Sequence, residues 1–166
     1  IGQYKTDVMA ARIHDINPDC RVTAIRAFYE EENKEQFFAD NLSYIADAID
    51  SVKSKLSLIA EAQARSIPII SSMGTGNRLD PAKFVITDIS KTSGCPLARV
   101  MRYELRKRGI LHHTVLSSTE LPRKPLPLEA PQNGRRSVPG SVSGVPPAAG
   151  MMIAGYIVRQ LLGENV

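Results

Sequence analysis

The sequence DAIDS at residues 47–51 lies at the end of a short apolar run and contains Asp50, a carboxylate that could act on a metal–phosphate ligand. In an open parallel sheet, ligands bind beyond the carboxyl ends of the strands. Asp50 falls at such an end, and a carboxylate there can hold Mg²⁺ that carries the phosphates of a nucleotide. The local alternative is that Asp50 caps the helix expected to begin at Val52.

Positively charged side chains supply a second kind of candidate site. Lys5 could reach a phosphate as a point charge, or it could be a solvated surface residue. Arg99, Arg102 and Arg106 are spaced three and four residues apart, which places them on one face of a predicted helix. That face could contact nucleic-acid phosphates, or it could simply be solvated. The net charge of +4 permits an anionic partner without requiring one.

The two cysteines offer thiol chemistry but cannot form a four-cysteine zinc site. Cys95 precedes Pro96 at a predicted helix N-terminus, where the helix dipole favours the thiolate. The alternative is that Cys95 is a small buried residue. Cys20 precedes a predicted strand and is expected in the core. The three histidines lack ligand spacing with either cysteine, so no metal is assigned to them.

The run MGTGN at residues 73–77 follows an apolar stretch that is predicted to be a strand. Glycines at such a place can let the backbone approach a phosphate. No helix follows directly, because residues 78–81 have the composition of a turn. We therefore interpret 73–77 as a structural turn between strands.

Short apolar strands and helices must alternate to position these residues. The pattern predicts strands at 21–28, 44–49, 68–72, 84–89 and 112–117. It predicts helices at 6–16, 30–41, 52–65, 96–108 and 148–162. This alternation is typical of βαβ units, so we expect an α/β fold: a Rossmann-like, mostly parallel sheet with helices on both faces. Residues 119–144, rich in Pro, Gly and Ser, are expected to form a long crossing loop.

The composition fits a single globular domain over residues 1–166. Apolar residues make up 43% and charged residues 23%, which excludes a disordered chain. Two cysteines exclude a disulfide-rich scaffold, and a reducing cytoplasm is the simplest location. No secretory signal is visible, and the longest apolar run, residues 145–158, is too short for a transmembrane segment.

Taken together, several motifs form a familiar series that runs through nearly the whole chain: IGQYK (1–5), INPDC (16–20), DAIDS (47–51), DISKT and CPLARVMRYELRKRGI (88–110), and VPGSVSGVPPAAG (138–150). In this order they resemble the ubiquitin-activating-like adenylating enzymes. Within that group the chain is most similar to the family of bacterial tRNA threonylcarbamoyladenosine dehydratases.

The resemblance implies a nucleotide-binding fold, usually in a homodimer, that uses ATP and Mg²⁺ on a tRNA substrate. In this family the carboxylate of threonylcarbamoyladenosine is adenylated, and the carbamoyl group then closes a ring with net loss of water. Lys5 matches the family lysine that contacts ATP. Asp50 matches the aspartate of the ATP–Mg²⁺ site, with Ser51 beside it where related enzymes often have Asn.

The chain also departs from the family pattern. Family members carry a glycine-rich GxGGxGS loop, an acidic residue for the ribose and an Asn/Arg pair in an earlier segment, and none of these precedes Ile1. We therefore expect the first βαβ unit to be missing and the 166-residue chain alone not to hydrolyse ATP. Some dehydratases place a cysteine in the crossing loop, whereas residues 119–144 contain none, so no catalytic thiol is assigned and Cys95 is kept only as a candidate.

Two other functions stay open at the level of sequence. The chain could activate the C-terminus of a ubiquitin-like sulfur-carrier protein, but such enzymes commonly bind zinc through two CxxC pairs, and this chain has no CxxC. It could also be a non-enzymatic module that dimerises. Gly150 and Ala154, four residues apart in the last predicted helix, would permit close helix contact, or would pack in an ordinary core.

Overall fold

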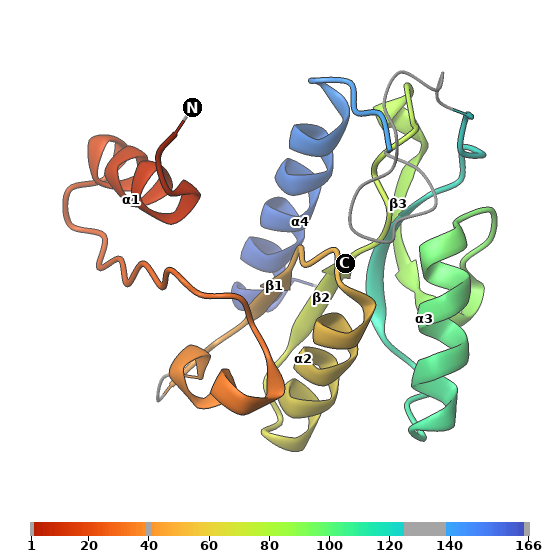
Figure 1. The fold of residues 1–166 in the computed structure, drawn as a ribbon, viewed down its shortest axis with the longest axis horizontal. Helices are drawn as coiled ribbons and strands as arrows, with labels where there is room; N and C mark the ends of the chain where they lie inside the picture. The colour runs from red at the N-terminus through yellow and green to blue at the C-terminus, as the bar shows by residue number, and fades with distance from the viewer. Residues whose placement is uncertain (1, 39–40, 125–138, 165–166) are drawn as a thin grey trace. The chain divides into compact units, whose positions relative to one another are not determined.

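The computed structural model describes residues 2–38, 41–124 and 139–164 (Figure 1). The chain divides into two compact units, residues 1–40 and residues 41–166. Among the described residues, no helix is long and apolar enough to cross a membrane.

Residues 41–166 are built around a four-stranded sheet in the order β1-β2-β4-β3. The strands β1 (Ile45–Asp47), β2 (Ile69–Ser72) and β4 (Thr114–Ser118) run parallel, and β3 (Phe84–Asp88) pairs antiparallel with β4. The prediction of a mostly parallel α/β sheet is therefore confirmed. Each observed strand lies within or next to its predicted range.

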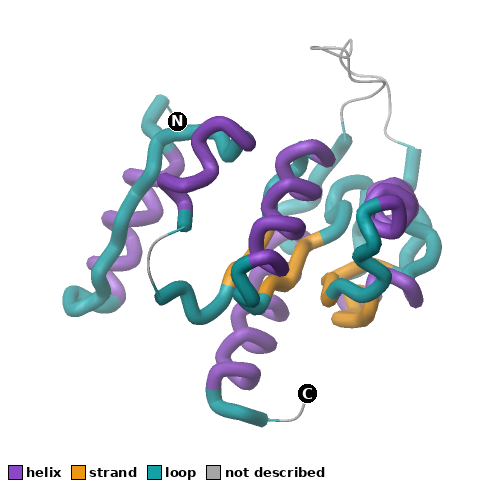
Figure 2. The backbone as a smooth tube through the Cα atoms, turned by 90° about the horizontal axis from the view of Figure 1, so that it is seen from below, coloured by secondary structure: helices purple, strands orange, loops and turns teal. Residues whose placement is uncertain are grey.

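Helices flank this sheet: α2 (Val52–Ala64), α3 (Pro96–Lys107) and α4 (Val145–Leu161) (Figure 2). Short 3-10 turns, η2 (Pro81–Lys83) and η3 (Ile89–Lys91), lie on either side of β3. Helix α4 begins three residues earlier than the predicted start at 148. Prolines are accepted there because the first-turn N–H groups of a helix have no partner within the helix.

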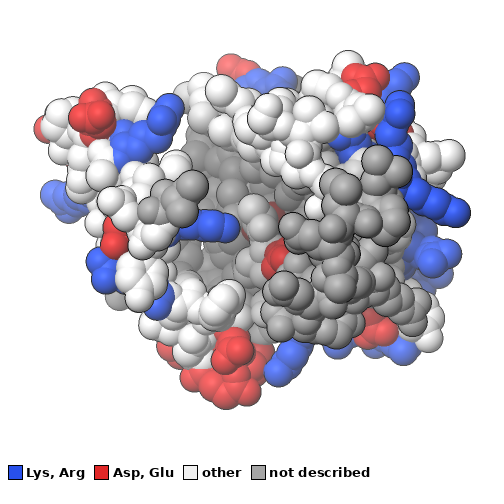
Figure 3. Space-filling model, turned by 45° about the horizontal axis from the view of Figure 1, so that its top comes forward, with Lys and Arg blue, Asp and Glu red and all other residues white. Residues whose placement is uncertain are grey.

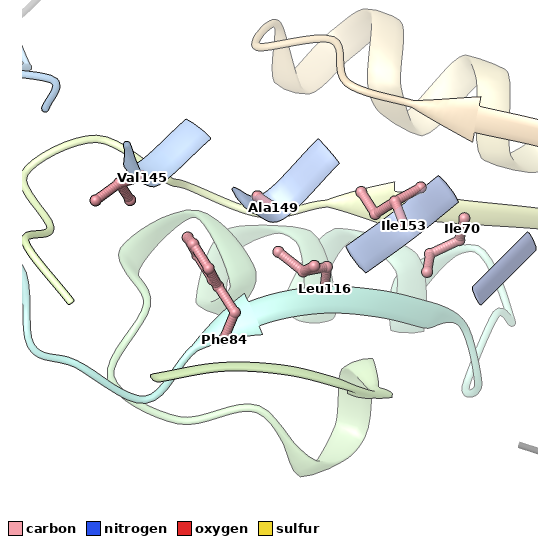
Figure 4. Packing of buried hydrophobic residues seen from close by; sticks show 6 residues of the cluster. All are labelled: Ile70, Phe84, Leu116, Val145, Ala149 and Ile153. Atoms are coloured by element: carbon pink, nitrogen blue, oxygen red, sulfur yellow. The ribbon is translucent and has the colours of Figure 1, made fainter. Parts of the chain in front are cut away.

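The apolar core on one face of the sheet joins α4 to three strands. Val145, Ala149 and Ile153 recur at helical spacing along α4, and they pack on the strand residues Ile70, Phe84 and Leu116 (Figure 4). Because side chains alternate along a strand, Ser71 and Val115, the neighbours of Ile70 and Leu116, point to the opposite face. The core thus fixes which strand residues face α4 and which face the other way.

Residues 1–40 contain α1 (Lys5–Ile16) and a 3-10 helix, η1 (Glu31–Phe37). The ring of Tyr29 packs edge-on against Phe37 and Phe38, with centroids 5.3 Å and 6.4 Å apart. The predicted helix at 30–41 is therefore shorter and of 3-10 type, and residues 39–40 lie outside the described residues.

The predicted strand at 21–28 is wrong: no strand is formed there. Its alternating pattern favours an extended chain, but a strand also needs a neighbour that accepts its backbone hydrogen bonds. No described residue pairs with this segment as a strand. The prediction of a core position for Cys20, which rested on this strand, fails with it, since Cys20 is exposed.

The described parts of the predicted crossing loop, residues 119–124 and 139–144, contain neither helix nor strand, and α4 begins directly after them at Val145. Residues 125–138 lie outside the described residues, so the prediction of one continuous loop over 119–144 is not tested there.

Candidate functional site

A cleft of about 570 Å³ opens where β1 and β2 end. Two of its walls follow the strands: residues 48–50 after β1, and residues 72–78 at and after the end of β2. The first residues of α3 and the N-terminal half of α4 form the others. Pro122, Pro139 and Ser141 of the crossing loop complete the lining. The carboxyl ends of parallel strands are where α/β proteins bind ligands, because the connecting segments diverge there and leave a crevice.

Asp50 lines this cleft and is exposed, as the sequence predicts for a ligand-binding carboxylate. The alternative role, capping α2, belongs instead to Ser51. Its side-chain oxygen accepts a hydrogen bond from the backbone N–H of Ser54 at 3.4 Å. Ser51 thus orders the start of α2, and Asp50 stands one residue before it at the cleft.

The turn at residues 73–77 forms a wall of the cleft, so its interpretation as a purely structural turn was incomplete. Gly76 is closely packed: a Cβ atom there would lie 3.1 Å from the Cβ of Pro139 and 3.4 Å from the carbonyl oxygen of Gly140. The available signal was the position of two glycines directly after a buried parallel strand.

Asn77 ties this turn to both described ends of the crossing loop. Its backbone adopts the left-handed conformation, with φ of 59°. Its N–H donates to the carbonyl oxygen of Gly140 at 2.7 Å, and its Oδ1 accepts from the N–H of Gly140 at 2.7 Å. Its carbonyl oxygen accepts from the N–H of Arg123 at 2.9 Å. The loop therefore leaves and returns at the mouth of the cleft.

Arg78 and Glu120 form a second connection that the sequence did not indicate. Arg78 is buried, lines the cleft and donates to the carbonyl oxygen of Glu120. The carboxylate of Glu120 accepts the N–H of Asp80 at 3.0 Å and that of Leu79 at 3.1 Å. These backbone donors hold the pKa of Glu120 below its usual value. The contacts fix the chain as it leaves the turn.

A buried polar cluster lies beneath α2, on the sheet face opposite α4. The Nζ atom of Lys55 is 2.7 Å from Oδ2 of Asp47, and both side chains are fully buried. Ser71 faces Asp47 across the β1–β2 register, and its Oγ is 2.8 Å from Nε2 of His113. Burial lowers the pKa of Lys55, against the opposing effect of Asp47. Burial also lowers the pKa of His113 to about 4.

Cys95 is buried and precedes α3 without a side-chain cap. Its Sγ lies close to the glycine turn, 3.7 Å from the position that a Cβ of Gly74 would take. This placement fits the small buried residue considered at the outset. Its part as a catalytic thiol stays a prediction.

The basic face predicted on α3 is divided by the structure. Arg99 and Arg106 are exposed. The Nη1 atom of Arg102 instead donates to the carbonyl oxygen and to Oγ1 of Thr92, at 2.8 Å and 2.6 Å, so this side chain holds the turn after β3. The predicted contact of Arg102 with nucleic acid stays a prediction.

The exposed part of α3 carries further cationic groups. The ammonium of Lys107 lies 4.2 Å from the ring centroid of Tyr103, which is itself exposed. Lysine and arginine side chains gather along the right-hand edge of Figure 3, the side on which Figure 1 places α3. The exposed basic surface of α3 is defined here by the exposed residues Arg99, Tyr103, Arg106 and Lys107.

Lys5 is the exposed first residue of α1 and belongs to residues 1–40, whereas Asp50 belongs to residues 41–166. The joint action of these two residues on a nucleotide stays a prediction. Within the described ranges, no group of three or more His, Cys, Asp or Glu side chains could hold a metal ion.

A mostly parallel sheet, flanked by helices and with a cleft at its carboxyl edge, defines a doubly wound α/β protein of the ligand-binding class. The pattern of the ThiF family matches residues 1–166. The chain is 44% identical over 173 residues to a tRNA threonylcarbamoyladenosine dehydratase of Bacillus subtilis, covering 99% of this chain and 68% of the relative. It is 42% identical over 106 residues to the Escherichia coli enzyme of the same name, covering 64% of this chain and 40% of that one.

Solved structures give the same result. The E. coli tRNA N6-threonylcarbamoyladenosine dehydratase in complex with ATP superposes with a TM-score of 0.84 and 32% identity, over 98% of this chain and 65% of that one. Its complex with AMP gives a TM-score of 0.82. The chain therefore belongs to the ThiF family and, within it, to the group of tRNA threonylcarbamoyladenosine dehydratases. It spans about two thirds of the length of the Bacillus relative and of the solved E. coli chain.

Proposed function

We propose that this chain forms part of an ATP-dependent enzyme that cyclises threonylcarbamoyladenosine in tRNA. The observation that carries the proposal is the cleft at the carboxyl ends of β1 and β2, with Asp50 on its wall and a glycine turn opposite. Relatives at 42–44% identity bear the name of this activity, and a relative with the same fold has been solved in complex with ATP and with AMP.

In the proposed reaction, the carboxylate oxygen of the substrate attacks the α-phosphorus of ATP, and pyrophosphate leaves. The carbamoyl group then attacks the activated carbonyl carbon, closes the ring and expels AMP. Formation of AMP and pyrophosphate thus removes the equivalent of one water from the substrate. AMP is a good leaving group where hydroxide is not, and groups that stabilise charge on the transferring phosphorus accelerate such a step.

The residues around the cleft suit the phosphate end of a nucleotide. Asp50 offers one carboxylate, and a single carboxylate fits Mg²⁺ because this ion keeps several waters and takes its other ligands from phosphates. When bound, Mg²⁺ would neutralise phosphate charge. Gly74 and Gly76 let the backbone approach a ligand closely, and the N-terminus of α3 faces the same cleft. Lys5 is proposed as a further phosphate contact.

For the tRNA we propose the exposed basic surface of α3. Arg99 and Arg106 would contact backbone phosphates, and Tyr103 adds an exposed ring beside Lys107. We further propose a homodimer in the cytoplasm, as the family resemblance implies. Activation of a carrier protein is not favoured, since the similar relatives are named as tRNA threonylcarbamoyladenosine dehydratases.

The proposal is tested by binding of MgATP to the ¹⁵N-labelled chain, followed by NMR. We expect the amide signals of residues 49–51 and 74–77 to shift, and Asp50→Asn to weaken binding by about tenfold, the worth of one charge-assisted contact. Glu164→Gln, an exposed carboxylate beyond the far end of α4, is the matched control and should leave binding unchanged. Shifts confined to other regions would contradict the assigned site.

A further inference from the structure

The loop between β1 and α2 is held at both ends by one carboxylate. Oδ1 of Asp47 accepts the backbone N–H of Ile49 at 2.9 Å, and Oδ2 accepts from Nζ of Lys55 at 2.7 Å. Asp47 is the last residue of β1, and Lys55 is the fourth residue of α2. The two bonds therefore fix the first residues of the loop and the start of the helix relative to each other, and Asp50 lies between these points.

Further polar side chains lie beside the pair on the neighbouring strands. Ser71 is the register partner of Asp47 on β2, and its Oγ shares a hydrogen bond with Nε2 of His113. The backbone N–H of His113 donates in turn to Oδ2 of Asp88 at the end of β3. The charged or titratable groups near the pair are Asp50, His113 and Asp88. Hydrogen bonds thus run from Ser71 of β2 to His113, which precedes β4, and on to Asp88 at the end of β3, whereas Asp47 is joined to Ser71 by the β1–β2 register.

Burial of a full ion pair at this place is not explained by stability alone. Two charges removed from water contribute little net stability, and apolar residues of similar volume often serve as well or better. What an ion pair does supply is direction, since each oxygen of Asp47 accepts a hydrogen bond from a defined donor. Residues 48–54 connect Asp47 to Lys55 along the chain, and Asp50 lies within this short segment.

We propose that the buried Asp47–Lys55 pair is a positioning device that holds the carboxylate of Asp50 toward the cleft. Neither residue would contact the nucleotide: both are fully buried, and the cleft is lined by residues 48–50 in front of them. The inference rests on the proposed function, because Asp50 is taken to act on the metal–phosphate end of ATP. Asp47 and Lys55 would thus act on the nucleotide site only through the position of Asp50.

The test compares an apolar replacement of the pair with a matched surface change. Asp47→Leu/Lys55→Met removes both charges together, so no unpaired charge is left in the interior. Lys55→Arg keeps the charge and the hydrogen-bond donor. Lys53→Met makes the same chemical change on an exposed position of the same helix. Urea unfolding of all four proteins first establishes that each is folded.

Amide hydrogen exchange supplies the first readout. In the double variant, exchange at Ile49 and Asp50 should accelerate by about tenfold, as expected for loss of one hydrogen bond, while amides of β4 and α4 stay at the wild-type rate. The single variant Lys55→Arg should keep the slow exchange of the wild type at these amides. Lys53→Met should also exchange at the wild-type rate. Unchanged exchange at residues 49–51 in the double variant, or equal acceleration over the whole sheet, would overturn the proposal.

Ligand binding supplies the second readout, with MgATP and magnesium-free AMP as probes. The double variant should bind MgATP about tenfold more weakly and AMP equally well, because only the metal-bound ligand depends on Asp50. Equal weakening of both would point to general damage and would contradict positioning. If the wild-type chain binds neither probe, the proposed function fails for this chain, while the exchange result still decides whether the pair orders the loop.

Discussion

Residues 41–166 and residues 1–40 follow similar sequence patterns but reach different degrees of burial. In the first, Leu116, Ile70 and the α4 residues Val145, Ala149 and Ile153 form a closed apolar core. In the second, α1 has no buried residue at all, and its apolar side chains Val8 and Met9 are about half exposed. An amphipathic pattern was present in both regions.

The difference shows which structures form locally and which need partners. A helix satisfies its own backbone hydrogen bonds, so α1 forms although none of its side chains is buried. A strand does not, so the alternating residues 21–28 stay unpaired while β1, β2 and β4 form in a region where each has a neighbour. Burial of polar groups differs in the same way, because the Asp47–Lys55 pair is enclosed and the Arg26–Asp7 pair is not.

The largest contrast is expected between these two ion pairs. Lys55→Met leaves the carboxylate of Asp47 buried without its partner, which should lower the free energy of unfolding by about 3–5 kcal/mol. Arg26→Ala removes one partner of an exposed pair and should cost no more than about 1 kcal/mol. Urea unfolding followed by circular dichroism measures both. A similar loss in the two variants would remove the distinction between the regions.

A second contrast concerns the apolar side chains. Leu116 is fully buried between β2, β3 and α4, so Leu116→Ala should lower the free energy of unfolding by about 2–5 kcal/mol through lost contacts and a cavity. Met9 on α1 is about half exposed, and Met9→Ala should change the free energy of unfolding by only about 0.5 kcal/mol. A large loss on Met9→Ala would mean that this face of α1 is covered in solution.

The polar cluster should also make stability depend on pH. The folded pKa of His113 is lowered to about 4 from 6.5, so the unfolded chain takes up a proton first as the pH falls. Stability is then full above pH 6.5, falls between pH 6.5 and pH 4, and levels off below, by about 3 kcal/mol in all. The groups facing the ring are Asp47, Lys55 and Asp88. Unfolding of wild type and His113→Gln across this range checks the result, since the variant should lack this component.

The smallest effect is expected where the chain is extended but unpaired. Amides of residues 21–28 should exchange with solvent nearly as fast as in an unfolded peptide, whereas those of β4 should be protected to the level of global unfolding. Phe28→Ser, at a side chain that is 89% exposed, should alter the free energy of unfolding by less than about 0.5 kcal/mol. Strong protection at 21–28 would show that this segment pairs in solution and would weaken the contrast.

Much of the fold between residues 41 and 166 was predictable from the sequence. Apolar runs of four to six residues, separated by helical periodicity, indicated β1, β2, β3, β4 and the helices between them within a few residues. Pro96 and Gly109 marked the ends of α3 because of their backbone preferences, and Gly109 does adopt a positive φ. These signals are local, and so they survive in a single sequence.

The site was only partly predictable. The position of Asp50 after β1 indicated a ligand site, because the carboxyl ends of parallel strands lie at the same edge of the sheet, where α/β proteins bind ligands. The roles of Arg102, Asn77 and Arg78 were not indicated, since each depends on a segment distant in sequence: the turn after β3 for Arg102 and the ends of the crossing loop for the other two. A regular spacing of arginines says which face of a helix they share, but not what that face meets.

By itself, the amino-acid sequence determined the order and type of most elements and the placement of one carboxylate at a strand end, because hydrogen-bonding range and side-chain periodicity act over a few residues. Only the tertiary structure decided that Lys55 is buried on Asp47, that Asn77 gathers both ends of the crossing loop and that residues 21–28 do not form a strand. Each of these outcomes depends on whether a partner from another part of the chain lies within about 3 Å, which no local pattern records.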